Sequence, residues 1–348
     1  MRCKVCRGKT KNIYTTKLLP EYIWPKNIIK IKKSKCKVIS CYNCSHLQLQ
    51  NFSKKKIKSF YGSQNFALAA DSQHKIRILK IKNFYGNNFF KNNKILEVGG
   101  GINPLMLKKK DYDIIDFFIL KKIKKKLKEN AFEKNIDNFK IKKKYDTIIL
   151  FHTLEHLAYP GRALIKLKKS LNKNGLIFIE VPNFDFFIKY RPHYAIFHQH
   201  LNMFCIQSLK NLMHYCGFKI DNIFKNNDVL FCSFKKGSKN NFFIKKINNI
   251  KKIFTLKKNL YKLEGKLKKF IKKNKFDIYG CGGTATLLIN NYPFLKKLIL
   301  NLYDSDNRKN KKFLPGIKHK IKKFKNVNLK IKSLSFFSLK KNNNLQIL

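Results

Sequence analysis

Four cysteines near the start of the chain have the types and spacing of metal ligands. Cys3 and Cys6 form one Cys-x-x-Cys pair, and Cys41 and Cys44 form a second. Two such turns present four thiolates to one ion, which is the ligand set that tetrahedral zinc prefers. Four protein ligands close the coordination shell, so we expect this zinc to be structural rather than catalytic. Cys36 is a further candidate ligand, and a set of unpaired buried cysteines is the alternative interpretation.

A glycine turn forms the second candidate site. The apolar segment 94–98, predicted to be a strand, runs directly into Gly99, Gly100 and Gly101. Glycines at this point allow a sharp turn and let a cofactor approach the backbone without meeting a side chain. The dinucleotide fingerprint Gly-x-Gly-x-x-Gly is not matched, because Pro104 stands where the third glycine is required. The pattern therefore disfavours a dinucleotide cofactor, and a tight turn without a ligand is the other interpretation.

Two blocks together resemble the class I methyltransferases that use S-adenosylmethionine (SAM). The first is Leu-Glu-Val-Gly-Gly-Gly over 96–101, and the second runs over 146–157 and continues, after Pro160 and a predicted helix, into a strand at 174–179. The resemblance implies a Rossmann-like fold in which Glu97 and the three glycines hold the amino-acid end of SAM. Asp116, at the end of the next strand, is the candidate acceptor for the ribose hydroxyls, and Asp137 is a candidate to face the adenine.

Over nearly its whole length the chain is similar to the sugar C-methyltransferase family. The similarity covers the two cysteine pairs with the segment Cys44–Leu49, Tyr61-Gly62-Ser63, the methyltransferase core, the segment His198-Gln199-His200-Leu201-x-x-Phe204, and Tyr279–Gly283 with Asp304 to Gly316. Members of that family methylate a carbon next to the keto group of a nucleotide-linked deoxysugar. Such a reaction needs a base for the α-proton, a group that stabilises the enolate, and a methyl group in line with the carbanion.

The resemblance assigns three catalytic roles. His200 matches the family's base, and a neutral imidazole suits that task near neutral pH. His156 and Tyr61 match positions that hold the sugar and its enolate oxygen. Two residues depart from the family: Gln199 replaces the Glu before the base, and Phe197 replaces a frequent Tyr. Gln can orient an imidazole but cannot stabilise its protonated form with a full charge, so a weaker base or a different reaction is possible.

Several alternatives stay open. O- or N-methylation of a sugar or another small metabolite would need less basicity and is the closest one, followed by RNA methylation and by a non-catalytic binding protein. Five histidines between His152 and His200 also make a second, catalytic metal site conceivable. The sequence disfavours that site, because no carboxylate completes a recognised ligand pattern.

Alternating strands and helices must position these residues, which implies an α/β fold with a parallel sheet covered by helices on both faces. We expect a zinc-binding domain at 1–50, a helical linker at 51–90, a SAM-binding core at 91–235, a connecting helix at 236–275 and a second, smaller Rossmann-like domain at 276–335. In the last of these, the glycine turn 280–283 and the charged residues near Asp304 suggest a nucleotide site, or else a lobe kept for packing.

Composition limits the partners and the location. The 348 residues carry a formal charge of +58, but only six of the 77 basic residues are Arg, and Lys is spread throughout. A dedicated nucleic-acid surface is usually richer in Arg, so we expect a small-molecule substrate such as a nucleotide sugar and no specific nucleic acid. No apolar run approaches membrane-spanning length and the N-terminus has no signal-peptide stretch, so we expect a cytoplasmic protein. Nothing indicates the oligomeric state.

Overall fold

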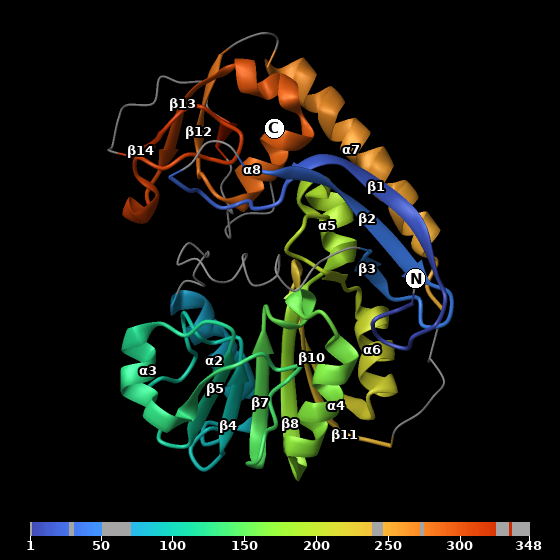
Figure 1. The fold of residues 1–348 in the computed structure, drawn as a ribbon, viewed down its shortest axis with the longest axis vertical. Helices are drawn as coiled ribbons and strands as arrows, with labels where there is room; N and C mark the ends of the chain where they lie inside the picture. Colours follow the sequence, from blue (N-terminus) through green and yellow to red (C-terminus); the bar gives the residue numbers. More distant parts are fainter. Residues whose placement is uncertain are drawn as a thin grey trace.

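The computed structural model describes residues 2–27, 31–50, 71–238, 246–271, 275–324 and 334–335. Its strands form one sheet of seven strands and two sheets of four. Figure 1 shows the seven-stranded sheet in the lower part of the view, the sheet of the C-terminal lobe at the top, and the N-terminal sheet along the right-hand side between them. Within the described ranges, no helix combines the length and the apolar character that crossing a membrane requires.

The seven-stranded sheet has the order β10-β11-β8-β7-β4-β5-β6. In chain order its strands are β4 (Ile95–Val98), β5 (Tyr112–Asp116), β6 (Ala131–Glu133), β7 (Tyr145–Phe151), β8 (Leu171–Pro182), β10 (Phe218–Phe224) and β11 (Val229–Lys236). β11 pairs antiparallel with both β8 and β10, whereas the pairs from β8 to β6 are parallel. The sheet is therefore mixed rather than wholly parallel, because the short connection between β10 and β11 permits only a hairpin return.

Helices cover both faces of this sheet, which explains why its strands are almost continuously apolar. Along β7, Ile148 and Leu150 join one core, and Ile149 and Phe151 join the other. The first core is closed by α4 and α6, and the second by α2 and α3 (Figure 1). These helices are α2 (Asp71–Tyr85), α3 (Lys121–Leu127), α4 (Pro160–Ser170) and α6 (Ile206–Tyr215). The predicted α/β fold with a Rossmann-like core is confirmed.

The strand order reverses between β4 and β7. From β4 the chain continues to β5 on one side, and from β7 it continues to β8 on the other. In open α/β sheets, ligands bind beyond the carboxyl ends of the strands at such a switch point. The glycine turn follows β4 and the segment with His152 and His156 follows β7, so both lie at this edge.

The N-terminal sheet is completed by a strand from the core. Its order is β1 (Thr10–Pro20), β2 (Lys33–Cys41), β3 (Leu47–Leu49) and β9 (Asn202–Met203). β3 and β9 pair through Leu47 with Met203 and Gln48 with Asn202. The cysteine-bearing unit is thus joined by backbone hydrogen bonds to the segment that directly follows His200.

The C-terminal lobe contains a parallel sheet in the order β14-β13-β12-β15. Its strands are β12 (Phe276–Tyr279), β13 (Ile299–Asp304), β14 (Ile321–Lys323) and β15 (Leu334–Ser335), with α8 (Gly283–Asn291) after the first of them. α7 (Asn249–Ile271), inside the region expected to be a connecting helix, runs along the outside of β1 and β2 towards this lobe (Figure 1).

The glycine turn of the lobe packs against the N-terminal unit. Gly280 has φ +90°, and the next residue, Cys281, donates its N–H to Asp304 Oδ2 at 2.7 Å. A Cβ built on Gly283 would lie 2.6 Å from Ile23 Cδ1, and one on Gly282 would lie 3.7 Å from the Trp24 ring. The loop that carries Ile23 and Trp24 therefore packs directly on this turn. This arrangement favours the packing interpretation of the turn.

Candidate active site and cysteine cluster

The glycine turn after β4 is tightly enclosed by its neighbours. Gly99 has φ +97°, a conformation that favours glycine. A Cβ on Gly101 would lie 2.1 Å from the backbone oxygen of Phe118, and the Gly101 N–H donates to Asp116 Oδ2 at 2.8 Å. The turn and the end of β5 are therefore held together by a contact that tolerates no side chain at position 101.

Glu97 holds the loop that follows the glycine turn through hydrogen bonds. It is 4% exposed, and its Oε2 accepts hydrogen bonds from the Leu105 N–H at 2.9 Å and from the Tyr112 hydroxyl. Burial raises the pKa of Glu97 to about 7, against the opposing effect of the Leu105 hydrogen bond. The carboxylate thus fixes the chain that follows the glycine turn, and its predicted contact with SAM stays a prediction.

The two aspartates predicted to bind SAM lie at the same edge of the sheet. Asp116 ends β5 beside the glycine turn, where burial raises its pKa to about 6. Asp137 lies four positions beyond the end of β6, and its backbone oxygen accepts a hydrogen bond from Lys166 of α4. The donor chemistry of the edge suits SAM: a glycine turn for its amino-acid end and a carboxylate for its ribose hydroxyls.

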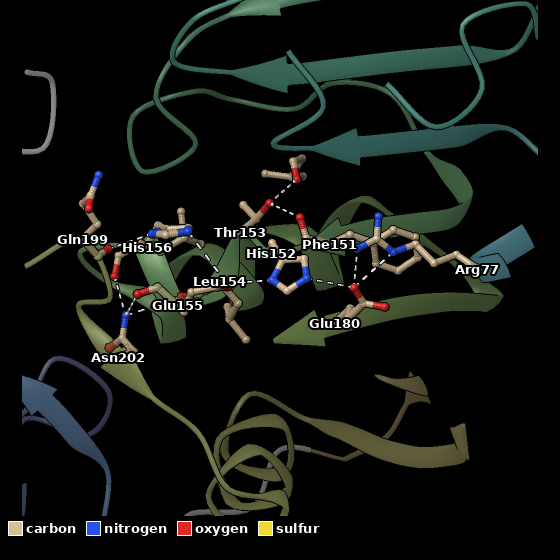
Figure 2. A network of polar contacts seen from close by, with 12 residues as sticks. Arg77, Phe151, His152, Thr153, Leu154, Glu155, His156, Glu180, Gln199 and Asn202 are labelled. Carbon is tan, nitrogen blue, oxygen red and sulfur yellow. Dashed lines mark hydrogen bonds and ion pairs between the residues drawn. The ribbon is translucent and has the colours of Figure 1, made fainter. Parts of the chain in front are cut away.

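A chain of charged side chains, in which His152 is exposed and both carboxylates are buried, connects this edge to the catalytic candidates (Figure 2). His152 Nε2 lies 3.0 Å from Glu180 Oε1, and its Nδ1 lies 3.3 Å from Glu155 Oε1. Arg77 of α2 donates to the same Glu180 oxygen, with Nε at 3.1 Å. Burial alone would lower the pKa of His152, but the two carboxylates outweigh it and raise that pKa to about 9. The network therefore pairs Arg77 and His152 with the carboxylates of Glu180 and Glu155.

His156 and His200 lie side by side at the end of this network. The Nδ1–H of His156 donates to the backbone oxygen of Gln199 at 2.7 Å, and the two imidazole rings meet edge-on with centroids 5.1 Å apart. The ring of Phe197 lies 4.1 Å from that of His200. Burial, followed by the charge of His156, lowers the pKa of His200 to about 3, so its imidazole is neutral.

The remaining catalytic candidates are placed differently. Gln199 is 3% exposed, and neither polar atom of its side chain has a hydrogen-bond partner in the described part of the chain. Its amide group points away from Glu155 in Figure 2. Tyr61 lies outside the described residues. A small pocket beside His200 has largely aromatic walls that include Phe184, Phe187 and Tyr194.

The tertiary structure adds a carboxylate to the histidine cluster. The sequence offered no carboxylate to complete a histidine metal site, yet Glu155, His156 and His200 bring one ligand atom each to within 4.8 Å of one another. Spacing along the chain did not show this, because His200 returns to Glu155 only through the tertiary fold. Glu180 and Arg77 were missed for the same reason.

The four cysteines of the two Cys-x-x-Cys pairs converge. Cys3 Sγ lies 3.6 Å from Cys44 Sγ, Cys6 Sγ lies 3.5 Å from Cys41 Sγ, and all four sulfurs lie within 4.8 Å of one another. Four thiolates bound at about 2.3 Å to a tetrahedral zinc would be about 3.8 Å apart, so the donor set fits such an ion. Cys36 is separate from this cluster, and its Sγ lies 3.5 Å from His198 Nδ1.

The two cysteine turns have the same backbone geometry. In each, the first cysteine accepts from the N–H four residues on, from Arg7 at 3.0 Å and from Ser45 at 3.1 Å. These donors also share a positive φ, +61° and +56°. In each turn the first cysteine donates its own N–H one residue further, to Gly8 or His46. Two segments far apart in the sequence thus adopt the same turn conformation.

Comparison with known proteins agrees with the fold. Residues 70–223 match the family model of a methyltransferase domain. The match and the switch-point architecture define these residues as a class I SAM-dependent methyltransferase domain. The chain is therefore an enzyme that transfers methyl groups from SAM. A search of curated proteins gave no significant match.

Three of the solved structures that match part of this chain are as follows. A SAM-dependent methyltransferase of Thermotoga maritima, described as a possible histamine N-methyltransferase, is 14% identical, with 47% of this chain and 90% of its own covered and a TM-score of 0.36. A protein of Pyrococcus horikoshii OT3 is 11% identical, with 47% and 91% covered and a TM-score of 0.38. The O-methyltransferase of a trans-AT PKS multienzyme of Brevibacillus brevis, in complex with S-adenosyl-L-homocysteine, is 12% identical, with 47% and 72% covered and a TM-score of 0.35.

Proposed function

We propose that this methyltransferase acts on a carbon next to the keto group of a nucleotide-linked deoxysugar, with His200 as the base. The observation that carries the proposal is the half-buried imidazole of His200 beside His156 and within 4.8 Å of the buried carboxylate of Glu155. A base that must take a proton from carbon has to be unprotonated beforehand and stabilised afterwards. The resemblance of the chain to sugar C-methyltransferases supports the substrate class.

His200 takes the α-proton on a ring nitrogen, and the electron pair of the broken C–H bond moves into the enolate. SAM, when bound, supplies an electrophilic methyl group for the carbanion. His156 and Tyr61 hold the sugar and its enolate oxygen. Once the methyl group is transferred, the imidazolium of His200 releases its proton to solvent and the neutral base is restored.

Glu155 takes the place of the missing acid at position 199. Its Oε1 lies 3.8 Å from His156 Nε2, and one of its oxygens lies within 4.8 Å of His200. Although burial opposes it, the imidazoles of His156 and His152 hold the pKa of Glu155 below its usual range, so the carboxylate is charged. We assign Glu155 as the positioning residue that stabilises the imidazolium of His200.

We propose that SAM is bound by the residues of the glycine turn and by three acidic residues near it, namely Glu97, Gly99, Gly100, Gly101, Asp116 and Asp137.

We further propose that a structural zinc is held by Cys3, Cys6, Cys41 and Cys44. The ion would stabilise the N-terminal unit, because binding by four thiolates from two separate turns contributes folding free energy. The five domains predicted from the sequence are retained as a proposal, with 1–50 and 276–335 enclosing the substrate side of the core.

The test is methyl transfer from SAM to a panel of nucleotide-linked keto-deoxysugars, followed by mass spectrometry and NMR of the product. Carbon methylation replaces an α-hydrogen, and the wild-type enzyme should also exchange that hydrogen with deuterium from solvent. His200→Ala should lose both reactions while it still binds SAM. Methylation of oxygen or nitrogen without deuterium exchange would overturn the proposal in favour of the second candidate, O- or N-methylation, which the Gln at position 199 favours.

A further inference from the structure

Two lysines meet at Gly316, where the N-terminal sheet touches the C-terminal lobe. Lys33 begins β2, and Lys296 belongs to the short helix η4 (Pro293–Lys297) that follows α8. A Cβ built on Gly316 would lie 3.2 Å from Lys33 Nζ and 3.4 Å from Lys296 Nζ. Two ammonium groups from segments more than 250 positions apart therefore converge on one glycine.

In the described part of the chain, no ion pair neutralises these two ammonium groups. Within the described ranges, no carboxylate oxygen lies within the 4.0 Å ion-pair distance of Lys33 or Lys296. The residues outside those ranges contain no Asp or Glu. Glu21, which follows the β1 residue paired with Lys33, accepts a hydrogen bond from Ser34 Oγ at 2.7 Å. None of the acidic side chains that the structure describes therefore supplies the neutralising charge.

The surroundings hold the lysines in place. Lys296 Nζ donates to Asn290 Oδ1 at 3.2 Å, and the amide of Asn290 donates to the backbone oxygens of Thr286 at 2.8 Å and Pro315 at 3.1 Å. Gly316 has φ +77°, so a side chain there would be strained as well as crowded. Burial, followed by the neighbouring Lys33, lowers the pKa of Lys296 to about 8.

We propose that Lys33 and Lys296 form a binding site for a phosphate or diphosphate group. A multiply charged oxyanion between two ammonium groups removes their repulsion and accepts hydrogen bonds from both. The site adjoins the catalytic side of the molecule, because Ser34, next to Lys33, lies 3.3 Å from His198, two residues before His200. A nucleotide-linked substrate would bring such a diphosphate; that source rests on the proposed function, whereas the anion site does not.

The experiment is isothermal titration of the full chain with inorganic pyrophosphate and, separately, with uridine diphosphate. Both titrations are done in about 0.3 M NaCl, where the screening length is below about 8 Å and scattered surface lysines bind anions weakly. The variant is Lys33→Met/Lys296→Met. Its matched control is Lys35→Met/Lys297→Met, which removes two exposed lysines from the same two elements. Thermal unfolding of all three proteins is measured with and without pyrophosphate.

We expect one saturable site in the wild type and in the control, and at least a tenfold weaker affinity in Lys33→Met/Lys296→Met. We also expect that variant to unfold at a higher temperature than the wild type without pyrophosphate and to gain nothing from its addition, because the repulsion is gone. Equal loss in both variants, or no saturable site in the wild type, would overturn the proposal. Tighter binding of uridine diphosphate than of pyrophosphate identifies a nucleotide as the source, and equal binding identifies free phosphate compounds.

The outcome does not depend on methyl transfer. If pyrophosphate binds to a saturable site but no keto-sugar is methylated, the anion site is supported and only the proposed reaction on a nucleotide sugar is rejected. If a keto-sugar is methylated but pyrophosphate shows no saturable binding, only the proposed anion site is rejected.

Discussion

The carboxylate of Glu155 lies 3.8 Å from Nε2 of His156, while the Nδ1–H of the same imidazole donates to the backbone oxygen of Gln199. A negative charge therefore reaches the two histidines from the end of β7 rather than from the residue before His200. This relationship is the basis of our proposal that Glu155, rather than the residue at position 199, stabilises the imidazolium.

Replacing Glu155 by Gln should slow α-hydrogen exchange by about 100-fold, the usual size of a general-base effect, with little change in KM. Because the base becomes weaker, the acid limb of the kcat/KM profile should also move to lower pH. Glu129→Gln, an exposed control, should behave as the wild type. An unchanged pH profile with reduced protein stability would mean that Glu155 serves only the fold.

Gly101→Ala should abolish SAM binding, because its Cβ would lie 2.1 Å from the Phe118 backbone oxygen and would displace the loop from Asp116. Gly265→Ala, in α7 with open space around the new Cβ, is the matched control and should stabilise the protein by about 0.5–1 kcal/mol. Isothermal titration with SAM measures the first effect and denaturant unfolding the second. SAM binding of normal affinity by Gly101→Ala would exclude the glycine turn as the cofactor site.

Removal of metal should unfold the N-terminal sheet. The purified protein should contain about one zinc per chain. The Cys41→Ser variant should contain no zinc and should no longer unfold cooperatively at the temperature at which the wild type does. Cys36→Ser should keep the zinc, because Cys36 lies outside the four-sulfur cluster. Elemental analysis and calorimetry report the two quantities. A metal content that is the same in Cys41→Ser and in the wild type contradicts the assignment.

His193 should make the protein less stable in acid. It is 6% exposed, and burial, followed by Arg191, lowers its pKa to about 3 from the ordinary value of 6.5. Between these two values only the unfolded chain binds the proton, so the free energy of unfolding should fall as the pH falls, by up to about 1.4 kcal/mol per pH unit. His193→Gln should flatten this slope relative to the wild type; an unaltered slope would assign the acid sensitivity to other groups, such as His200.

Several features were determined by the sequence itself because they depend on neighbours in the chain. The two Cys-x-x-Cys turns, the strand that runs into Gly99 and the alternation of strands and helices follow from local spacing and apolar periodicity. These patterns predicted the Rossmann-like core and the place of the glycine turn. They did not predict that β11 runs antiparallel to its neighbours or that Trp24 packs on the glycine turn of the C-terminal lobe.

The tertiary structure decided which charged groups meet. Arg77 and Glu180 are 103 positions apart, His156 and Gln199 are 43 apart, and Lys33 reaches Lys296 only across the junction of two sheets. No local pattern encodes such pairs, because they arise when whole elements pack to bury their apolar faces and carry their polar residues along. The type of protein could thus be predicted from short stretches of sequence, whereas the partners of its charged groups depended on how those stretches pack in three dimensions.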